Sequence, residues 1–269
     1  MTRHERMKRR DRYARILLPM AILAAAVFGW DRLVVLNDIP RYVLPRPGLV
    51  LETLINDWDI LYLALLNTLK ITFGALAIAT VGGVALAILF TQSKWIEISF
   101  FPFAVILQVT PIIAIAPLIF IYVESITVGL LICAWLVAFF PILSNTTLGL
   151  NSADHNLRDL FTLSGANRWQ MLWLLRLPSA MPYFLGGLKI AGGLALIGAI
   201  VAEFAAGTGG AGAGLAFRIL EAGYRLNIPR MFAALLLVSA TGVLIFFSLT
   251  VFSHLMLRKW HESALTRDN

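Results

Sequence analysis

Three ionisable residues lie within long apolar stretches of the sequence: Lys70, Lys189 and Glu203. Charged groups are costly in hydrocarbon, so each of these residues is a candidate functional residue. Lys70 lies about one third of the way into its stretch and has the reach to extend toward the head groups. Lys189 lies nearer the middle of its own stretch, where it suits a pathway for an anionic solute. Glu203 is about 21 Å from Lys189 along a helix, so a pair between them requires a helix break or a second copy of the chain.

Neutral polar residues in the apolar stretches offer hydrogen bonds to a solute or between helices. We expect a structural or gating role for Glu203 and a pathway role for Lys189. The predicted pathway or gate residues are Gln108, Thr110, Asn145, Lys189 and Glu203.

Motifs for ATP hydrolysis, metal binding and acid–base catalysis are missing from the sequence. There is no Gly-x-x-x-x-Gly-Lys-Ser/Thr phosphate loop, so any ATP that drives this protein is hydrolysed by another chain. The run from Gly207 to Gly212 contains a Gly-x-Gly-x-x-Gly pattern, but it follows an apolar stretch instead of a strand. The four histidines have no ligand spacing, and the one cysteine, Cys133, lies in an apolar run. We therefore predict no catalytic residues, no cofactor and no metal.

The composition predicts a membrane protein. Of the 269 residues, 59% are hydrophobic and 14% are charged, whereas soluble domains have about 45–50% and about 25%. Four stretches without Asp, Glu, Lys or Arg exceed the ~20 residues of a membrane helix. Two further stretches are interrupted by charges, and the first has the basic start of a signal peptide but no small-x-small cleavage site. We predict an all-α protein with six transmembrane helices, at 15–36, 62–91, 97–122, 126–149, 179–206 and 231–257.

The distribution of positive charge orients these helices. With the N-terminus in the cytosol, most Lys and Arg residues fall in cytosolic segments, which is the positive-inside pattern. The net charge of +7 is then an orientation signal that also favours anionic lipid, and it does not indicate nucleic acid. The predicted organisation is a cytosolic basic N-terminus (1–14), a transmembrane domain (15–257) with a cytosolic loop at 150–177, and a cytosolic C-terminus (258–269).

The loop at 150–177 has the pattern of two short helices separated by a glycine turn. Asp154 is suited to cap the first helix, and Asn167 to cap the second. Gly165 between them suits the left-handed conformation that ends a helix. Leu157, Leu160, Phe161 and Ser164 follow at helical spacing and form one face. From the residues alone, this face either rests on lipid or docks into a groove on another protein.

The external connections and the internal prolines add weaker signals. Residues 37–61 contain three prolines and then a stretch, Leu49 to Trp58, that suits a short interfacial helix. Residues 204–230 begin with a glycine-rich run that suits a flexible gate or a docking surface. Prolines at 102, 111, 117 and 141 predict kinks in the third and fourth helices.

The spacing of Gly165, nine residues, Leu175, one residue and then Leu177-Pro178 resembles the signature loop of permeases in binding-protein-dependent ABC importers. Asp159, Leu160 and Phe161 stand where that signature begins with Glu-Ala-Ala, and Leu175 replaces Ile. The resemblance extends from about Pro45 to Trp260 and is closest to the nitrate/sulfonate/taurine branch. Further matching pieces are 44–47, 110–118, 139–142, 145–146, 177–182, 187–189 and 202–203.

The resemblance implies a type I ABC importer permease fold in the bacterial inner membrane. It implies a homodimer of permeases, cytosolic ATPase subunits and an external solute-binding protein. The loop would be the ATPase-coupling segment, with these residues: Asp154, Leu157, Asp159, Leu160, Phe161, Ser164, Gly165, Ala166, Leu175, Leu177 and Pro178.

The solute stays open among nitrate, sulfonates, taurine and pyrimidine-type vitamin precursors. The alternatives are an ion-gradient-driven transporter, for which no inverted repeat is found, and a membrane-embedded enzyme, for which the catalytic residues are missing.

Overall fold

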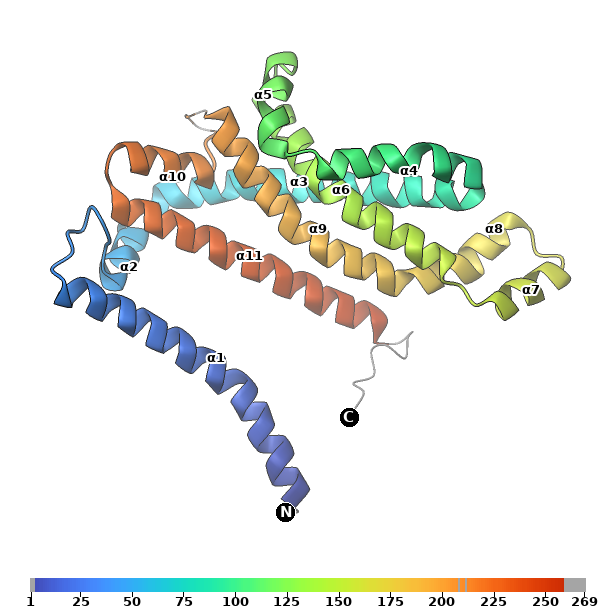
Figure 1. Ribbon diagram of the computed structural model, residues 1–269, viewed down its shortest axis with the longest axis horizontal. Coiled ribbons are helices and arrows are strands. Elements are labelled where there is room, and N and C mark those ends of the chain that lie inside the picture. The colour runs from blue at the N-terminus through green and yellow to red at the C-terminus, as the bar shows by residue number, and fades with distance from the viewer. Residues whose placement is uncertain (1–2, 208, 211, 259–269) are drawn as a thin grey trace. The chain divides into compact units, whose positions relative to one another are not determined.

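The computed structural model describes residues 3–207, 209–210 and 212–258, and all regular structure in these ranges is helical (Figure 1). The predicted C-terminal tail therefore lies outside the described residues, apart from Arg258. The helices are α1 (Arg3–Leu36), α2 (Pro47–Asn56), α3 (Trp58–Gln92), α4 (Lys94–Val109), α5 (Ile112–Tyr122), α6 (Ile126–Asn151), α7 (His155–Leu163), α8 (Arg168–Met171), the π-helix η1 (Leu172–Arg176), α9 (Leu177–Ala206), α10 (Leu215–Tyr224) and α11 (Ile228–Leu257).

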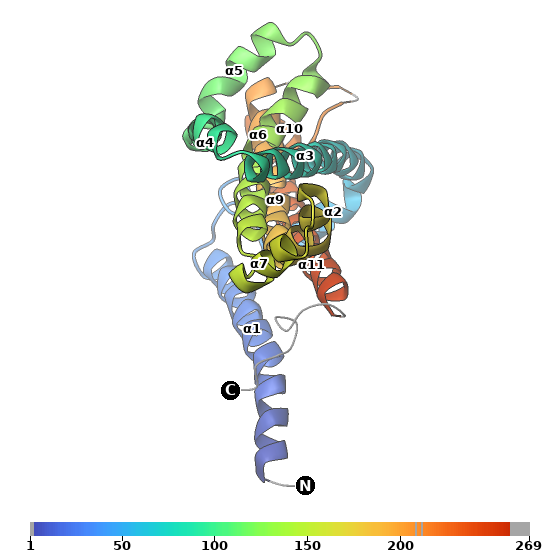
Figure 2. The ribbon, with the colours of Figure 1, turned by 90° about the vertical axis from the view of Figure 1, so that its right-hand side faces the viewer.

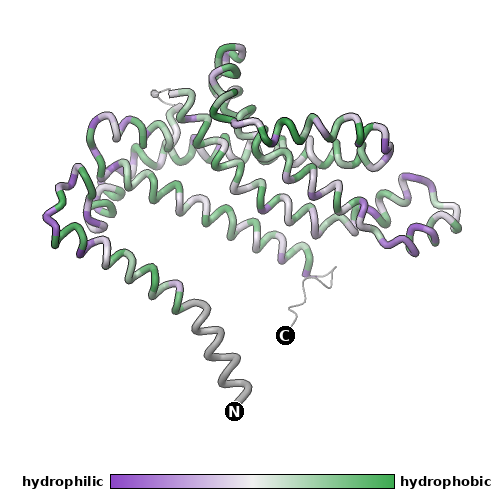
Figure 3. Tube along the Cα trace, in the orientation of Figure 1, coloured by the Kyte–Doolittle hydropathy of each residue, from purple (hydrophilic) through white to green (hydrophobic). Residues whose placement is uncertain are grey.

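Five helical segments among the described residues are long and apolar enough to cross a membrane: Leu17–Leu36, Trp58–Gln92, Ile126–Asn151, Arg168–Ala206 and Ile228–Leu257. A sixth results if α4 and α5 together form one span. The predicted all-α class is confirmed, and six spans are reached when the α4–α5 pair is counted as one. Figure 3 shows the apolar character of these helices and the more hydrophilic segment around α7.

The third predicted helix, 97–122, is not continuous. α4 and α5 are separated by a break at Thr110 and Pro111, and the two helices are bent by 100°. Both break residues are extended, with φ/ψ of −71°/122° and −64°/116°. Proline has no N–H and disfavours the helical conformation of the residue before it, so the helix ends here. The kink predicted at Pro111 is thus a break, whereas the prolines at 102, 117 and 141 lie inside helices.

The chain divides into two compact units. One contains Tyr62–Arg218 and the chain from Leu237 onward. Its centre is the α6–α9 pair, which lies side by side in Figures 1 and 2. A Cβ on Gly187 would lie 2.7 Å from the Pro141 carbonyl oxygen, and one on Gly198 would lie 2.9 Å from the Ala134 Cα. Small residues at helix interfaces in membranes let two backbones approach this closely.

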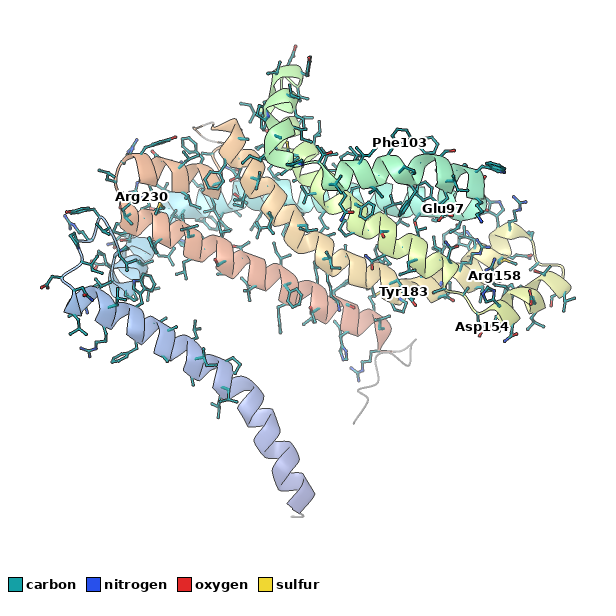
Figure 4. The ribbon with its side chains drawn as sticks, viewed as in Figure 1. Glu97, Phe103, Asp154, Arg158, Tyr183 and Arg230 are labelled. Carbon is teal, nitrogen blue, oxygen red and sulfur yellow. The ribbon has the colours of Figure 1, made fainter. Side chains whose placement is uncertain are left out.

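The other unit contains the chain up to Leu61 together with Ile219–Leu236. Arg230, labelled in Figure 4, pairs with Asp57 at 2.6 Å (Nε to Oδ2). Arg46 pairs with Asp31 at 2.9 Å, and this hydrogen bond raises the pKa of Arg46 above the ordinary arginine value. The short helix predicted from Leu49 to Trp58 is observed as α2, with a proline at its start, while its external location stays a prediction. The helix α10 was not predicted, since residues 204–230 were interpreted only as a connection.

Candidate coupling segment and membrane-embedded polar sites

The predicted cytosolic loop folds as two short helices joined by a glycine turn. Oδ1 of Asp154 accepts a hydrogen bond from the backbone N–H of Asn156 at 2.7 Å and so caps α7. Gly165 follows α7 with a φ of +74°. Asn167 and Gln170 form a capping box at the start of α8, with both hydrogen bonds at 2.8 Å. These local predictions are confirmed, because each depends on residues within a few positions along the chain.

The apolar side chains of α7 are presented to the outside. No residue of α7, all of which the structure describes, is buried. Leu157 is 46% exposed and Leu160 is 56% exposed, while Phe161 is half-buried. Polar side chains lie in the same segment as these leucines, among them Asp154 and Arg158, which are labelled in Figure 4. The loop therefore offers a short, capped helix with exposed leucines.

The Asp154 cap gives a first testable expectation. Asp154→Ala removes the acceptor for the Asn156 N–H and should weaken the start of α7 by about 1 kcal/mol. Hydrogen–deuterium exchange of the α7 amides should then be several-fold faster, with α6 and α9 unchanged. Asp154→Asn retains a capping oxygen and serves as the control. Equal exchange in the alanine and asparagine variants would contradict a role for this cap.

A π-helix within the predicted coupling segment connects α8 to α9. The π-helix Leu172–Arg176 ends two residues before Pro178, which has no N–H to donate to Leu174. Leu172 and Leu175 are buried, whereas Leu177 and Pro178 are half-buried in the first turn of α9. The signature positions that follow the glycine thus form the root of the segment, where it joins α9, instead of its exposed tip.

Arg176 links this root to a helix distant in sequence. Its Nη1 donates a hydrogen bond to the backbone carbonyl of Thr91 at 3.1 Å, in the last turn of α3. A cation is favourable at a helix C-terminus, where unpaired carbonyls accumulate. From the sequence alone, Arg176 is only one of the positive charges that orient the chain, because its partner is 85 positions away.

Glu203 is the centre of a buried polar cluster. It is 4% exposed, and its Oε1 accepts a hydrogen bond from the Thr68 hydroxyl at 2.7 Å. Its Oε2 accepts from the Ala216 N–H at 3.0 Å, while the Thr68 oxygen accepts from the Leu215 N–H at 2.9 Å. A Cβ at Gly214 would overlap the carboxyl group. The cluster therefore joins α3, α9 and the first turn of α10, whose amides have no partner within their own helix.

The other predicted pathway residues do not gather around Glu203. The partners of Glu203 are Thr68 and Ala216, so a pair with Lys189 is not formed within the described chain. Lys189 is half-buried and Lys70 is exposed. Asn145 donates its amide to the carbonyl of Pro141 in its own helix at 2.8 Å.

Gln108 and Thr110 lie at the break between α4 and α5. Both line a cavity there, and neither Lys189 nor Glu203 is among its lining residues. The five predicted residues thus do not form one site: Gln108 and Thr110 share this cavity, whereas Asn145, Lys189 and Glu203 do not line it. In the part of the chain that the structure describes, no group of three or more His, Cys, Asp or Glu side chains is placed to hold a metal ion.

Comparison with known proteins assigns the family. Residues 62–258 match the family described as the binding-protein-dependent transport system inner membrane component. The chain belongs to this family. It is a transmembrane permease of the ABC importer class, and the family assignment favours this function over an ion-gradient-driven transporter.

Relatives and a solved structure agree with this assignment. The permease is 32% identical over 254 residues to the riboflavin transport system permease protein RibX of Chloroflexus aurantiacus, covering 91% of this chain and 90% of the relative. It is 32% identical over 217 residues to the formylaminopyrimidine transport permease protein ThiX of Halalkalibacterium halodurans, covering 80% and 85%. Permeases named for aliphatic sulfonates, nitrate and taurine also match, at 26–27% identity.

A crystal structure of an amino acid ABC transporter with histidines superposes with a TM-score of 0.62 at 18% identity, covering 77% of this chain and 97% of that chain. This likeness confirms the predicted type I permease fold.

Proposed function

We propose that this permease forms the membrane pathway of an ATP-driven importer in the bacterial inner membrane, with both termini in the cytosol. Separate cytosolic ATPase subunits bind the segment Asp154–Pro178, and an external solute-binding protein delivers the solute. The observation that carries this proposal is the exposed leucine face of α7 on a helix that is capped at its start and anchored at its root. A loop that only connects two membrane helices and binds no partner would have no use for exposed leucines.

The connections of the segment suggest how movement reaches the membrane. α7 follows α6 directly, and the π-helix joins α8 to α9. Since α6 and α9 form the packed centre of their unit, displacement of α7 acts on both helices at once. The bond from Arg176 to the Thr91 carbonyl extends this link to the end of α3. Opening and closing of the ATPase pair would then move three helices together.

The permease functions as a homodimer in this proposal. Several large apolar side chains of α4 and α5 are exposed in the single chain, including Phe103 (Figure 4) and Ile113. Lipid and a second permease copy are the two surroundings that suit them. The solute is small, of the kind that its relatives are named for: nitrate, sulfonates, taurine, riboflavin or a formylaminopyrimidine.

The proposed ATPase contact is tested on opposite faces of α7. Leu160→Asn places an amide in the proposed hydrophobic contact and should lower affinity for the cognate ATPase about thirtyfold, or about 2 kcal/mol, since a buried leucine contributes about that much. Thr162→Asn is the control, because residue 162 is turned away from the leucine face.

Binding to the ATPase and stimulation of its hydrolysis are measured with the permease in lipid nanodiscs. We expect the Leu160 variant to lose both while it stays folded and dimeric. Equal binding by wild type and both variants would rule out this face as the coupling contact.

A further inference from the structure

The break between α4 and α5 opens onto a cavity of about 330 Å³ within one compact unit. Its walls come from both halves of the broken pair and from α6 and α9. They include Leu107, Gln108, Thr110, Ile112, Leu136 and Leu194. The volume lies at the lower end of the range for small-molecule sites, and most of the wall is apolar, as is usual for such sites.

The backbone at the break has unused hydrogen-bonding groups. Pro111 has no N–H, so the Leu107 carbonyl lacks its helical donor. The N–H and the hydroxyl of Thr110 both donate to the Ile106 carbonyl, at 3.1 Å and 2.6 Å. The N–H of Ile112 begins α5 and has no acceptor among the described residues, and the Gln108 carbonyl, its helical partner in an unbroken helix, has no donor there.

The break lies at a depth in the membrane where free backbone groups are costly. Thr110 and Pro111 lie at the middle of the charge-free stretch 98–123, and hence near the middle of the predicted span. An unpaired backbone group in hydrocarbon costs several kcal/mol, so irregular backbone at membrane depth persists where it is buried in protein or lines a cavity. Broken helices at this depth form solute sites in other classes of transporter.

The lining determines which solutes this cavity suits. Among the described residues that line it, none is charged, and the polar side chains are Gln108 and Thr110. The Gln108 amide both donates and accepts hydrogen bonds, as do the free N–H and carbonyl groups of the break. An anion would find the free N–H at the start of α5 but no cationic side chain among the described lining residues, and these contacts replace only part of its hydration. An uncharged solute with donors and acceptors on an apolar body has a smaller free energy of hydration to lose, and the cavity can replace its hydrogen bonds.

We infer that this cavity is a solute subsite in the membrane, selective for uncharged solutes that carry amide-type donors and acceptors over inorganic or sulfonate anions. The inference rests on the proposed function, because it concerns a solute that the permease carries. It goes further by assigning the α4–α5 break as the site and by choosing between the chemical classes that the relatives leave open. Gln108 orients the solute through its amide, and the break supplies the backbone contacts.

The test measures binding to the purified permease in nanodiscs without its partners. The probes are riboflavin and cytosine as uncharged heterocycles, and nitrate and methanesulfonate as anions, each titrated to millimolar concentration by equilibrium dialysis. We expect at least one heterocycle to bind and neither anion to do so. Gln108→Leu should weaken the heterocycle at least tenfold, since it leaves polar groups of the solute unpaired. Gln92→Leu, at the end of α3 and outside the cavity, should bind like wild type.

Thr110→Val is a second cavity variant should Gln108→Leu fail to fold, and it should also weaken binding. Saturable binding of an anion, binding of no probe, or equal binding by the Gln108 and Gln92 variants overturns the inference. ATP-driven uptake by the complete transporter, measured in proteoliposomes, separates the two proposals. Uptake without heterocycle binding would refute the subsite alone, whereas failure of the ATPase to bind the permease would refute the proposed function.

Discussion

Replacing Gly187 by alanine is expected to destabilise the permease, while the same replacement at Gly186 stabilises it slightly. The two glycines are neighbours in α9 and share the same helical backbone. A Cβ at residue 187 would lie 2.7 Å from the Pro141 carbonyl oxygen and 2.9 Å from the Asn145 Cβ, whereas one at residue 186 meets nothing within 4 Å. Alanine is better than glycine in a helix by about 1 kcal/mol, and overpacking costs about 1–3 kcal/mol. Because the propensity gain is the same at both positions, the two variants should differ by the overpacking cost, about 1–3 kcal/mol.

Unfolding in mixed detergent, followed by circular dichroism, measures this difference. Gly193→Ala, also on α9 with no atom within 4 Å of the added Cβ, is a second control and should behave like Gly186→Ala. Because all three replacements make the same chemical change in one helix, helix propensity cancels between them. Equal stability of the Gly187 and Gly186 variants would show that α6 and α9 do not approach as closely as the structure has them.

Removing the carboxyl group of Glu203 is the second change with a large expected effect. Glu203→Ala leaves the Thr68 hydroxyl and the Ala216 N–H without their acceptors in a buried site. Each unpaired buried group costs about 1–3 kcal/mol, so we expect the two together to lower stability by about 2–6 kcal/mol. The first turn of α10 should loosen as well, because two of its amides depend on this cluster.

Thermal unfolding and hydrogen–deuterium exchange separate these two consequences. Exchange at Leu215 and Ala216 should be at least tenfold faster in Glu203→Ala, with α7 unaffected. Glu203→Gln retains one acceptor oxygen and should lose about half as much stability. If the alanine variant unfolds like wild type and protects Ala216 equally, then the cluster does not hold α10 in place.

The membrane helices were predictable because hydrophobic length is a property of contiguous residues. The predicted helices 62–91 and 231–257 correspond to α3 and α11, and each of their boundaries is shifted by four residues or fewer. The third helix was predicted too simply, since its prolines look alike in the sequence. Pro111 alone ends a helix, whereas Pro102 and Pro117 are accommodated inside α4 and α5. A proline predicts that a helix is distorted, but the surrounding packing decides whether the helix bends slightly or ends there.

The sequence by itself determined what depends on nearby residues: the apolar spans, the caps at Asp154 and Asn167, and the turn at Gly165. Such features form wherever the local pattern occurs, because their partners are a few positions away. Only the tertiary structure decided that Glu203 pairs with Thr68 instead of Lys189, that Arg176 reaches Thr91, and that the α4–α5 break meets a cavity. Each of these depends on which faces of distant helices meet. The helices are similarly hydrophobic, so their sequences do not show which faces will pack together.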